Sequence, residues 1–256
     1  MTYLSVKNLA IHFGGITAVD HLDFEVRQGQ VVSIIGPNGA GKTTVFNLLS
    51  GLYQANEGQI TFDGINITGK TVQEIAKAGI ARTFQNIRLF SDMRVIENVL
   101  IGTHIQTKYR LWNSLLRSKS FRDEEEEKKR YAAKLLKEVG LQDRIDDYAD
   151  NLPYGDQRKL EIVRAIATGA KLILLDEPAA GMNPQESEEL RKFIRKLKEK
   201  GYTILLIEHD MNVVMNVSDY IYVLDYGKKI AQGKPEEILM NKRVTAAYLG
   251  ESEVEE

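Results

Sequence analysis

The sequence predicts an α/β protein with an N-terminal antiparallel β layer, a mainly parallel core sheet and an inserted helical subdomain. Alternating apolar residues and turns fill the start of the chain, and later apolar runs precede helical segments, while the middle carries helical spacing with little strand signal. We expect the first part of the core at 1–86, the helical subdomain at 87–169, and the rest of the core with C-terminal helices at 170–256.

Composition sets broad limits on location and partners. The chain has 256 residues, is 43% hydrophobic and 27% charged, and carries a net charge of -2, which gives no indication of a nucleic-acid partner. It has no cysteine, which fits a reducing compartment. Its apolar runs are far shorter than the about 20 residues of a membrane helix, and its N-terminus lacks a signal-peptide core. We therefore expect a cytoplasmic protein that can dock on a membrane partner.

The β layer is predicted from three segments near the N-terminus. Residues 3–13 alternate between apolar and polar, residues 22–35 contain a turn at Gln28 and Gly29, and residues 58–68 form a strand–turn pair. Short alternating strands joined by turns are typical of an antiparallel sheet with one covered face.

The core sheet is predicted from runs without alternation. The segments "VVSII", "KLILLD" and "TILLIEH" are continuously apolar, as in parallel strands that are covered on both faces. Helices are expected to follow at residues 42–50, 184–200 and 211–217.

The middle of the chain is predicted to be helical. The stretches "RVIENVLIGTHI", "FRDEEEEKKRYAAKLLKEVG" and "GDQRKLEIVRAIATGA" carry helical spacing. The charged run favours a solvated helix face over an acidic binding patch, because three of its glutamates precede a basic residue by four positions. The expected pairs are Glu124 with Lys128, Glu125 with Lys129, and Glu126 with Arg130.

A phosphate-binding loop lies between the first core strand and its helix. Its spacing is G-x-x-x-x-G-K-[ST], from Gly36 to Thr43. The glycines let backbone N–H groups turn toward an anion, Lys42 supplies a cation for the β- and γ-phosphates, and the Thr43 hydroxyl suits Mg²⁺. The residues expected to bind ATP here are Gly36, Pro37, Asn38, Gly39, Ala40, Gly41, Lys42, Thr43 and Thr44.

Two acidic residues follow another core strand in "LILLDEP". Asp176 ends the apolar run, where a carboxylate is costly unless it faces a cation, so we expect it to hold Mg²⁺. Glu177 is expected to be the general base that polarises the attacking water. A surface acidic pair is the alternative, and the phosphate-binding loop favours the catalytic interpretation.

These motifs resemble the ATP-binding cassette (ABC) family over essentially the whole chain. Gln85 in "RTFQN" is similar to the glutamine that meets Mg²⁺ and water, and His209 in "LLIEHDM" to the histidine that contacts the γ-phosphate. Phe13 in "IHFGG" matches the aromatic residue on which adenine stacks, with packing in the β layer as the alternative. The resemblance implies a catalytic set of Lys42, Gln85, Glu177 and His209, and a metal-binding set of Thr43, Gln85 and Asp176.

The family's signature motif departs from its usual form. Where the family reads L-S-G-G-Q, this chain continues from Leu152 with Pro153, Tyr154, Gly155 and Asp156, which the resemblance assigns to the ATP of a partner subunit. Pro153 removes a serine hydroxyl but suits the first turn of a helix, whose N-terminus can still attract an anion. We expect weaker closure over the nucleotide at this motif.

Further stretches resemble the LivG type of ATPase, which serves branched-chain amino acid importers. They are "RTFQNIRLF", "MRVIENVL", "LPYGDQRKLEIVRA", "DEPAAGMNPQE" and "AAYLGE". Asn183 stands where the family usually has an aspartate, which affects the expected coupling between two sites. An extension carries Trp112, Leu115 and Leu116, which either pack on the core or meet a membrane subunit.

The resemblance implies an ATP-hydrolysing subunit at the inner face of the cell membrane, with ATP and Mg²⁺ as ligands. Its expected partners are integral membrane permeases and a second ABC ATPase, either LivF-like or another copy, in a head-to-tail dimer. Import of urea or amides, and lipid export, are the alternatives within transport. A DNA-maintenance ABC ATPase needs a long coiled coil that the segment from Gln85 to Leu152 cannot supply, and the intact catalytic set argues against a non-catalytic binding module.

Overall fold

The computed structural model describes residues 2–106 and 119–249, and its contacts divide the chain into two compact units. The core unit comprises Met1–Gln85 and Leu172–Glu256, and the helical unit comprises Asn86–Lys171. The α/β fold class with an antiparallel layer, a mainly parallel sheet and a helical segment is confirmed. Trp112, Leu115 and Leu116 lie outside the described residues.

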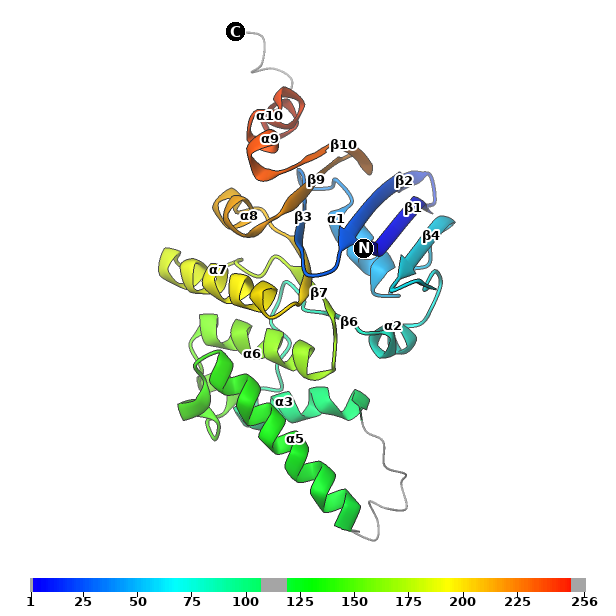
Figure 1. Ribbon diagram of the computed structural model, residues 1–256. Coiled ribbons are helices and arrows are strands. Elements are labelled where there is room, and N and C mark those ends of the chain that lie inside the picture. The colour runs from blue at the N-terminus through cyan, green and yellow to red at the C-terminus, as the bar shows by residue number, and fades with distance from the viewer. Residues whose placement is uncertain (1, 107–118, 250–256) are drawn as a thin grey trace. The chain divides into compact units, whose positions relative to one another are not determined.

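A four-stranded antiparallel sheet forms the N-terminal layer of the core unit (Figure 1). Its strands are β1 (Thr2–Phe13), β2 (Ile16–Arg27), β4 (Glu57–Phe62) and β5 (Ile65–Asn66), in the spatial order β2-β1-β4-β5. Asp63 and Gly64, both with positive φ, make the tight turn between β4 and β5, as expected of a two-residue hairpin loop.

The second sheet of the core unit has six strands in the order β10-β9-β3-β8-β7-β6. They are β3 (Val31–Ile35), β6 (Ile80–Arg82), β7 (Leu172–Asp176), β8 (Thr203–Ile207), β9 (Tyr220–Asp225) and β10 (Lys228–Gly233). All neighbouring pairs are parallel except β9 and β10. The three predicted apolar runs form β3, β7 and β8, and every residue in these strands is buried.

The three predicted core helices form within one residue of their expected ends. The helices of the core unit are α1 (Lys42–Leu49), α2 (Val72–Ala78), α7 (Pro184–Glu199), α8 (Met211–Val217), α9 (Pro235–Leu239) and α10 (Lys242–Leu249). Asn183 caps α7, because its Oδ1 accepts from the backbone N–H groups of Gln185 at 2.9 Å and Glu186 at 3.0 Å. The asparagine that departs from the family pattern is therefore a good residue for starting this helix.

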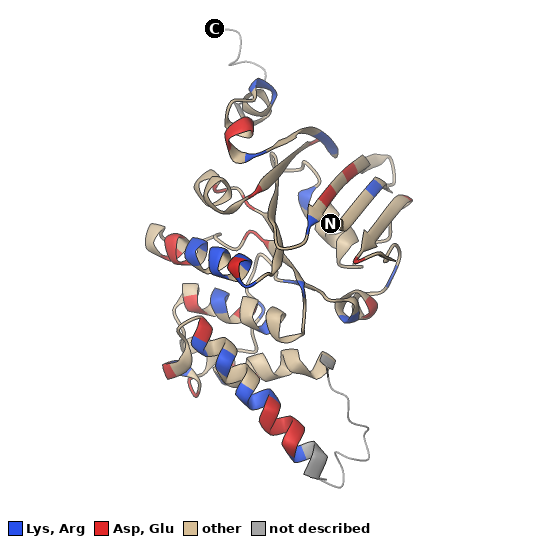
Figure 2. Cartoon of the chain, in the orientation of Figure 1, with Lys and Arg blue, Asp and Glu red and all other residues tan. Residues whose placement is uncertain are grey.

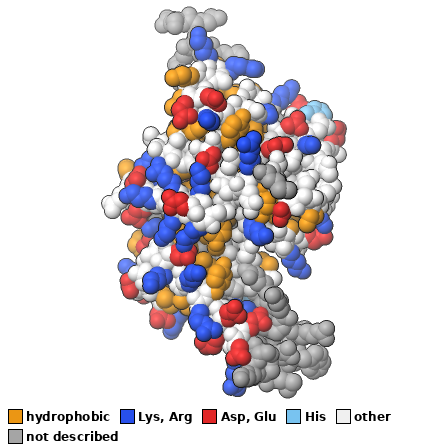
Figure 3. All heavy atoms as spheres, viewed as in Figure 1, with side chains coloured by type: hydrophobic (Ala, Val, Ile, Leu, Met, Phe, Trp, Pro, Cys, Tyr) orange, Lys and Arg blue, Asp and Glu red, His pale blue; other side chains and the backbone are white. Residues whose placement is uncertain are grey.

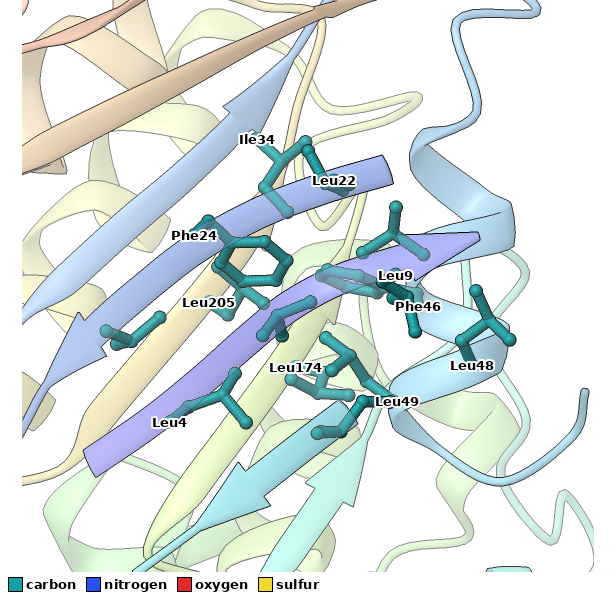
Figure 4. Packing of buried hydrophobic residues seen from close by; sticks show 14 of the residues in the cluster. Leu4, Leu9, Leu22, Phe24, Ile34, Phe46, Leu48, Leu49, Leu174 and Leu205 are labelled. Atoms are coloured by element: carbon teal, nitrogen blue, oxygen red, sulfur yellow. The ribbon is translucent and has the colours of Figure 1, made fainter. Parts of the chain in front are cut away.

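Helix α1 shares one hydrophobic cluster with both sheets. Figure 4 shows Phe46 of α1 beside Leu9 of the antiparallel layer and Leu49 of α1 beside Leu174 of the six-stranded sheet, and Leu205 of that sheet belongs to the same cluster. These side chains are at most 1% exposed, so burial of their apolar area stabilises the position of the helix. The loop that precedes Lys42 is consequently held at a helix fixed from two sides.

The helical unit contains α3 (Val95–Thr103), α5 (Lys119–Glu138) and α6 (Tyr154–Ala167), with short 3-10 turns at His104–Gln106, Gln142–Arg144 and Ala149–Asn151. Helix α5 carries both signs of charge along its length (Figure 2). The predicted Glu124–Lys128 pair forms at 3.3 Å. Glu125 and Glu126 instead pair with Lys128 and Lys129, three positions on, at 3.2 and 3.8 Å. Spacings of three and four both bring side chains together on a helix face.

Two properties of the described residues bear on membrane and surface interactions. Within the described ranges, no helix combines the length and apolarity needed to cross a bilayer. On the face seen in Figure 3, acidic and basic side chains are interspersed.

Candidate nucleotide-binding site

The loop between β3 and α1 requires glycine at two positions. Gly36 has φ 151° and Gly41 has φ 96°, conformations that residues with a side chain rarely adopt. A Cβ atom on Gly36 would lie 2.0 Å from the carbonyl oxygen of Leu224, and one on Gly41 would lie 2.4 Å from that of Ala18. The loop therefore fits between neighbouring strands only because these two residues lack side chains.

The N-terminus of α1 has no side-chain cap. Gly41 is its N-cap residue and cannot supply a capping oxygen, and no other side chain does so. The first backbone N–H groups of a helix, here those of Lys42, Thr43 and Thr44, have no acceptor within the helix. Together with the helix dipole, they provide a binding site for an anion.

Lys42 is buried beside this helix end. Its Nζ donates to the carbonyl oxygens of Gly36 at 2.7 Å and Pro37 at 2.8 Å. Burial lowers the pKa of Lys42, while the negative charges of Glu177 and Asp176 oppose that shift. The ammonium is therefore held at the loop by backbone carbonyls and nearby carboxylates, in position to exchange these contacts for a phosphate.

Three of the predicted catalytic residues meet at one carboxylate. Gln85 Nε2 donates to Glu177 Oε2 at 2.7 Å, and His209 Nε2 lies 2.8 Å from Glu177 Oε1. Glu177 directly follows β7 and has φ 46°, an uncommon conformation for this residue type. Such backbone strain often occurs at functional sites. The structure thus brings Gln85, Glu177 and His209 together and joins both oxygens of the predicted base to side-chain partners.

Asp176, the last residue of β7, faces a cation of the protein itself. Arg82 NH2 donates to Asp176 Oδ2 at 2.7 Å, and both side chains are buried. A cation was expected at Asp176, but Arg82 was not predicted. The available signal was a charged residue at the end of "GIAR", three positions before Gln85.

A cavity of about 330 Å³ lies over the loop. Its lining comprises Ile16, Thr17, Ala18, Asn38, Gly39, Ala40, Gly41, Lys42, Thr43, Thr44, Glu177, His209 and Tyr226. Ile16 and Tyr226 are 72% and 84% exposed and were not predicted as site residues. Both lie beside glycines in turns, which is a weak sequence signal. Phe13 lies outside this lining and packs edge-on against Tyr53, with ring centroids 5.2 Å apart, so its stacking on adenine stays a prediction.

The residues at the cavity suit a triphosphate with Mg²⁺. The glycine-dependent loop, the uncapped helix end and Lys42 fit phosphate oxygens. Among the described residues, no group of three or more histidine or acidic side chains is arranged to hold a metal ion. Mg²⁺ is commonly held by one or two protein oxygens together with substrate phosphates and water, so a site completed by the nucleotide agrees with Thr43, Gln85 and Asp176 as its protein contacts.

Glu208 is a buried carboxylate next to the site. Its oxygens accept from the backbone N–H groups of Ala179 at 2.6 Å, His209 at 3.0 Å and Asp210 at 3.3 Å. Burial raises its pKa, and these three hydrogen bonds oppose the shift. Glu208 therefore ties the segment after Glu177 to the backbone of His209. This role was not predicted, because a glutamate after an apolar strand gives no local indication of its partners.

The predicted signature residues lie at the start of α6 in the helical unit. Pro153 is the N-cap residue, with φ -53° and ψ 150°, and therefore lies one position before the first turn in which we expected it. No side chain caps this helix either. Asp156 pairs with Lys159 at 3.0 Å, which offsets part of its negative charge. Tyr154 and Gly155 belong to the first turn, so all four residues gather at one helix end.

Comparisons with known proteins agree with this geometry. The ABC transporter family matches residues 19–180, and the family described as branched-chain amino acid ATP-binding cassette transporter matches residues 228–254. The high-affinity branched-chain amino acid transport ATP-binding protein LivG of Salmonella typhimurium is 48% identical, over 97% of this chain and 98% of that protein.

Solved structures give the same result. The ADP conformation of MJ1267, an ATP-binding cassette of an ABC transporter, has a TM-score of 0.86 and 37% identity, covering 98% of this chain and 99% of the other. The dimeric post-hydrolysis state of the ATP-binding cassette MJ0796, bound to ADP and Pi, has a TM-score of 0.74 and 25% identity, covering 91% and 98%. With more than half of the chain matched by the family and a near-complete alignment to LivG, the chain belongs to the ABC transporter family, as an ATP-binding cassette of the LivG group.

Proposed function

We propose that this chain hydrolyses ATP to power an importer of branched-chain amino acids. The observation that carries the proposal is the carboxylate of Glu177, which lines the cavity over the phosphate-binding loop and is held by Gln85 and His209 at 2.7 and 2.8 Å. A base placed beside a phosphate cradle is the arrangement that water attack on a phosphoryl group requires. The cargo is inferred from the name of the LivG relative and from the family match at residues 228–254.

Each site residue has a distinct task in this proposal. The N–H groups at the start of α1 and the Lys42 ammonium bind the phosphates, and Phe13 supplies a surface for adenine. Thr43, Gln85 and Asp176 would hold Mg²⁺, which supplies positive charge that offsets the developing charge on the phosphates. Glu177 orients and deprotonates the attacking water, while His209 donates to the γ-phosphate and fixes Glu177 through the hydrogen bond described above.

A partner subunit completes the site. The dimeric, post-hydrolysis structure of MJ0796 supports a cassette dimer here, and a head-to-tail arrangement would place Pro153, Tyr154, Gly155 and Asp156 against the ATP of the partner. ATP that binds the closed dimer more tightly than the open one drives closure, and hydrolysis removes that preference. The partner cassette is LivF-like or a second copy, and the pair docks on integral membrane permeases at the cytoplasmic face, with no nucleic-acid partner.

Replacing the base tests this function. Glu177→Gln keeps the size of the side chain but cannot accept a proton, so turnover by the permease-bound complex should fall by roughly 10²–10⁴-fold. ATP affinity should stay close to the wild-type value, because Glu177 binds the phosphates only indirectly. Phosphate release and calorimetric ATP binding measure the two quantities.

Glu57→Gln, at an exposed position in β4, is the control and should leave both quantities unchanged. Wild-type phosphate release by Glu177→Gln would exclude Glu177 as the base. Failure of the wild-type complex to bind or hydrolyse ATP would overturn the proposed function as a whole.

A further inference from the structure

Arg82 joins three segments of the nucleotide site. It ends β6, three residues before Gln85, and its NH2 donates to Asp176 Oδ2 at the end of β7 at 2.7 Å. Its NH1 donates to Asn47 Oδ1 at 2.7 Å and to Ser50 Oγ at 3.1 Å. Asn47 lies in α1 and Ser50 is its C-cap, so one guanidinium connects the helix that begins at Lys42 with the strand that ends at Asp176.

Two aromatic rings hold the guanidinium of Arg82 in addition to its hydrogen bonds. Its central carbon lies 5.6 Å from the ring centroid of Phe46 and 5.2 Å from that of Phe84. The side chains of Arg82 and Asp176 are 7% and 6% exposed, so little water reaches the ion pair. In such surroundings a charge-assisted hydrogen bond is stronger and more directional than at the surface.

This arrangement is poorly explained as a device for stability alone. Buried ion pairs often contribute no more to folding than apolar residues of similar size would. Arg82 Nε has no hydrogen-bond partner in the described part of the chain, and an unmet buried donor opposes folding. A role in positioning Asp176 relative to α1 therefore explains the contact better than a contribution to stability.

Arg82 leaves one oxygen of Asp176 for other use. The guanidinium binds Oδ2, and Oδ1 has no donor among the described residues. Two of the three residues expected to approach Mg²⁺ with oxygen atoms, Thr43 and Asp176, belong to α1 and β7, the two elements that Arg82 connects. The distance between these two oxygen ligands thus depends on the hydrogen bonds that Arg82 makes to α1 and to Asp176.

We propose that Arg82 is a positioning residue that orients the Asp176 carboxylate, and sets its distance from α1, for binding of the magnesium–nucleotide complex. This inference rests on the proposed function, because it requires Asp176 to act at Mg²⁺. Arg82 contributes to the Mg²⁺-dependent part of nucleotide affinity and leaves the phosphate contacts of the loop unchanged.

The test compares ATP affinity in excess Mg²⁺ with ATP affinity in EDTA, by calorimetry on the purified full chain. The Mg²⁺-dependent gain is the ratio of the ATP affinity in excess Mg²⁺ to that in EDTA. Arg82→Gln should reduce this gain by about tenfold, the effect expected from losing one charge-assisted hydrogen bond. Its affinity in EDTA should stay within about twofold of wild type, because the phosphate-binding N–H groups and Lys42 are untouched. In Arg82→Lys the Mg²⁺-dependent gain in ATP affinity should fall by roughly threefold, since an ammonium keeps the charge but cannot reach three acceptors in a planar fork.

Arg158→Gln is the matched control. Arg158 forms an ion pair with Glu161 at the same length of 2.7 Å, with side chains 0% and 2% exposed, but both residues lie in α6 of the helical unit. Its removal perturbs a buried pair without touching Asp176, and should leave the Mg²⁺-dependent gain at the wild-type value.

Asp176→Asn supplies a second comparison and separates the possible outcomes. Arg82→Gln should cause no further loss of the Mg²⁺-dependent gain in the Asp176→Asn background. An equal gain in wild type and Arg82→Gln, or additive losses in the double variant, would overturn the inference. If Arg82→Gln does not fold, an unchanged gain in Arg82→Lys would overturn it. Absence of any Mg²⁺-dependent gain in the wild type would instead count against the proposed function.

Discussion

Helices α1 and α6, one in each unit, begin without a side-chain cap, whereas α2, α7 and α8 are capped. Thr71, Asn183 and Asp210 each accept backbone N–H groups at the starts of those three helices. Helices α3 and α9 also lack a side-chain cap, but Glu97 and Glu237 in their first turns accept from the N-cap N–H groups at 2.7 and 2.8 Å. The starts of α1 and α6 are the ones that the family resemblance assigns to phosphate. Among the helices whose N-cap residue the structure describes, α1 and α6 have neither a side-chain cap nor a first-turn glutamate bonded to the N-cap N–H group, which agrees with an anion site at each.

The two open ends differ in how strictly they are built. At α1, a side chain on Gly36 or Gly41 would collide with backbone, so the loop admits little change. At α6, Pro153 takes the cap position and Asp156 pairs with Lys159 at 3.0 Å, so the first turn has its own charge compensation. A heterodimer would tolerate the altered start of α6, because the partner chain can supply an unaltered signature helix to the other nucleotide site.

The largest expected effect comes from removing the cation at α1. Lys42→Ala should lower ATP affinity by about 100-fold, because it removes charge-assisted hydrogen bonds to phosphate. Without nucleotide, the free energy of unfolding should change by less than about 1 kcal/mol, since desolvation of the ammonium offsets its two hydrogen bonds to the loop carbonyls. Calorimetry and urea unfolding measure the two quantities.

Lys77→Ala, in the last turn of α2, is the control, because Lys77 is exposed and lies outside the cavity lining. It should bind ATP as wild type does. Unchanged affinity in Lys42→Ala would contradict the phosphate-binding role and remove the distinction between α1 and the capped helices.

The sequence predicted best what depends on local patterns. The glycine spacing located the loop, and continuous apolar runs located β3, β7 and β8, because each signal lies within a few neighbouring residues. Strand β6 has three residues and is too short for a pattern, and Arg82 meets a carboxylate 94 positions away, so neither was predicted. Asn183 was identified only as a departure from the family, although the predicted helix start at residue 184 places it at the N-cap position, where asparagine is preferred.

A smaller effect is expected from restoring the hydroxyl at α6. Pro153→Ser places a preferred capping residue at an N-cap whose φ and ψ suit it, which should stabilise the helical unit by about 1 kcal/mol. If the signature meets a partner's phosphate, the hydroxyl should also raise ATP turnover of the permease-bound complex by roughly fivefold, within the range of one hydrogen bond to a charged group. Urea unfolding and phosphate release report the two effects separately.

Pro184→Ser is the matched control, because Pro184 begins a helix that Asn183 already caps. Turnover should stay at the wild-type level in this variant. A more stable Pro153→Ser protein with unchanged turnover would show that the open end of α6 does not meet phosphate, and the parallel with α1 would fail.

The smallest effect is expected on the pH dependence of stability, and it concerns Glu208. This carboxylate accepts hydrogen bonds from backbone N–H groups just before the capped helix α8. Its pKa is raised by burial above the ordinary value of 4.5, so the folded chain retains a proton that the unfolded chain releases. The stability that this proton provides is present below pH 4.5 and is lost as the pH rises through the raised pKa.

Glu208→Gln carries no titrating group at this position, so its free energy of unfolding should fall less than that of wild type as the pH rises above 4.5. Urea unfolding at a series of pH values measures the two slopes, with Glu236→Gln at the exposed start of α9 as the control. Equal slopes for wild type and Glu208→Gln would mean that the internal carboxylate remains ionised at no cost to folding. The backbone N–H groups of Ala179, His209 and Asp210 would then stabilise an internal anion, so this role of backbone N–H groups would not be limited to open helix ends.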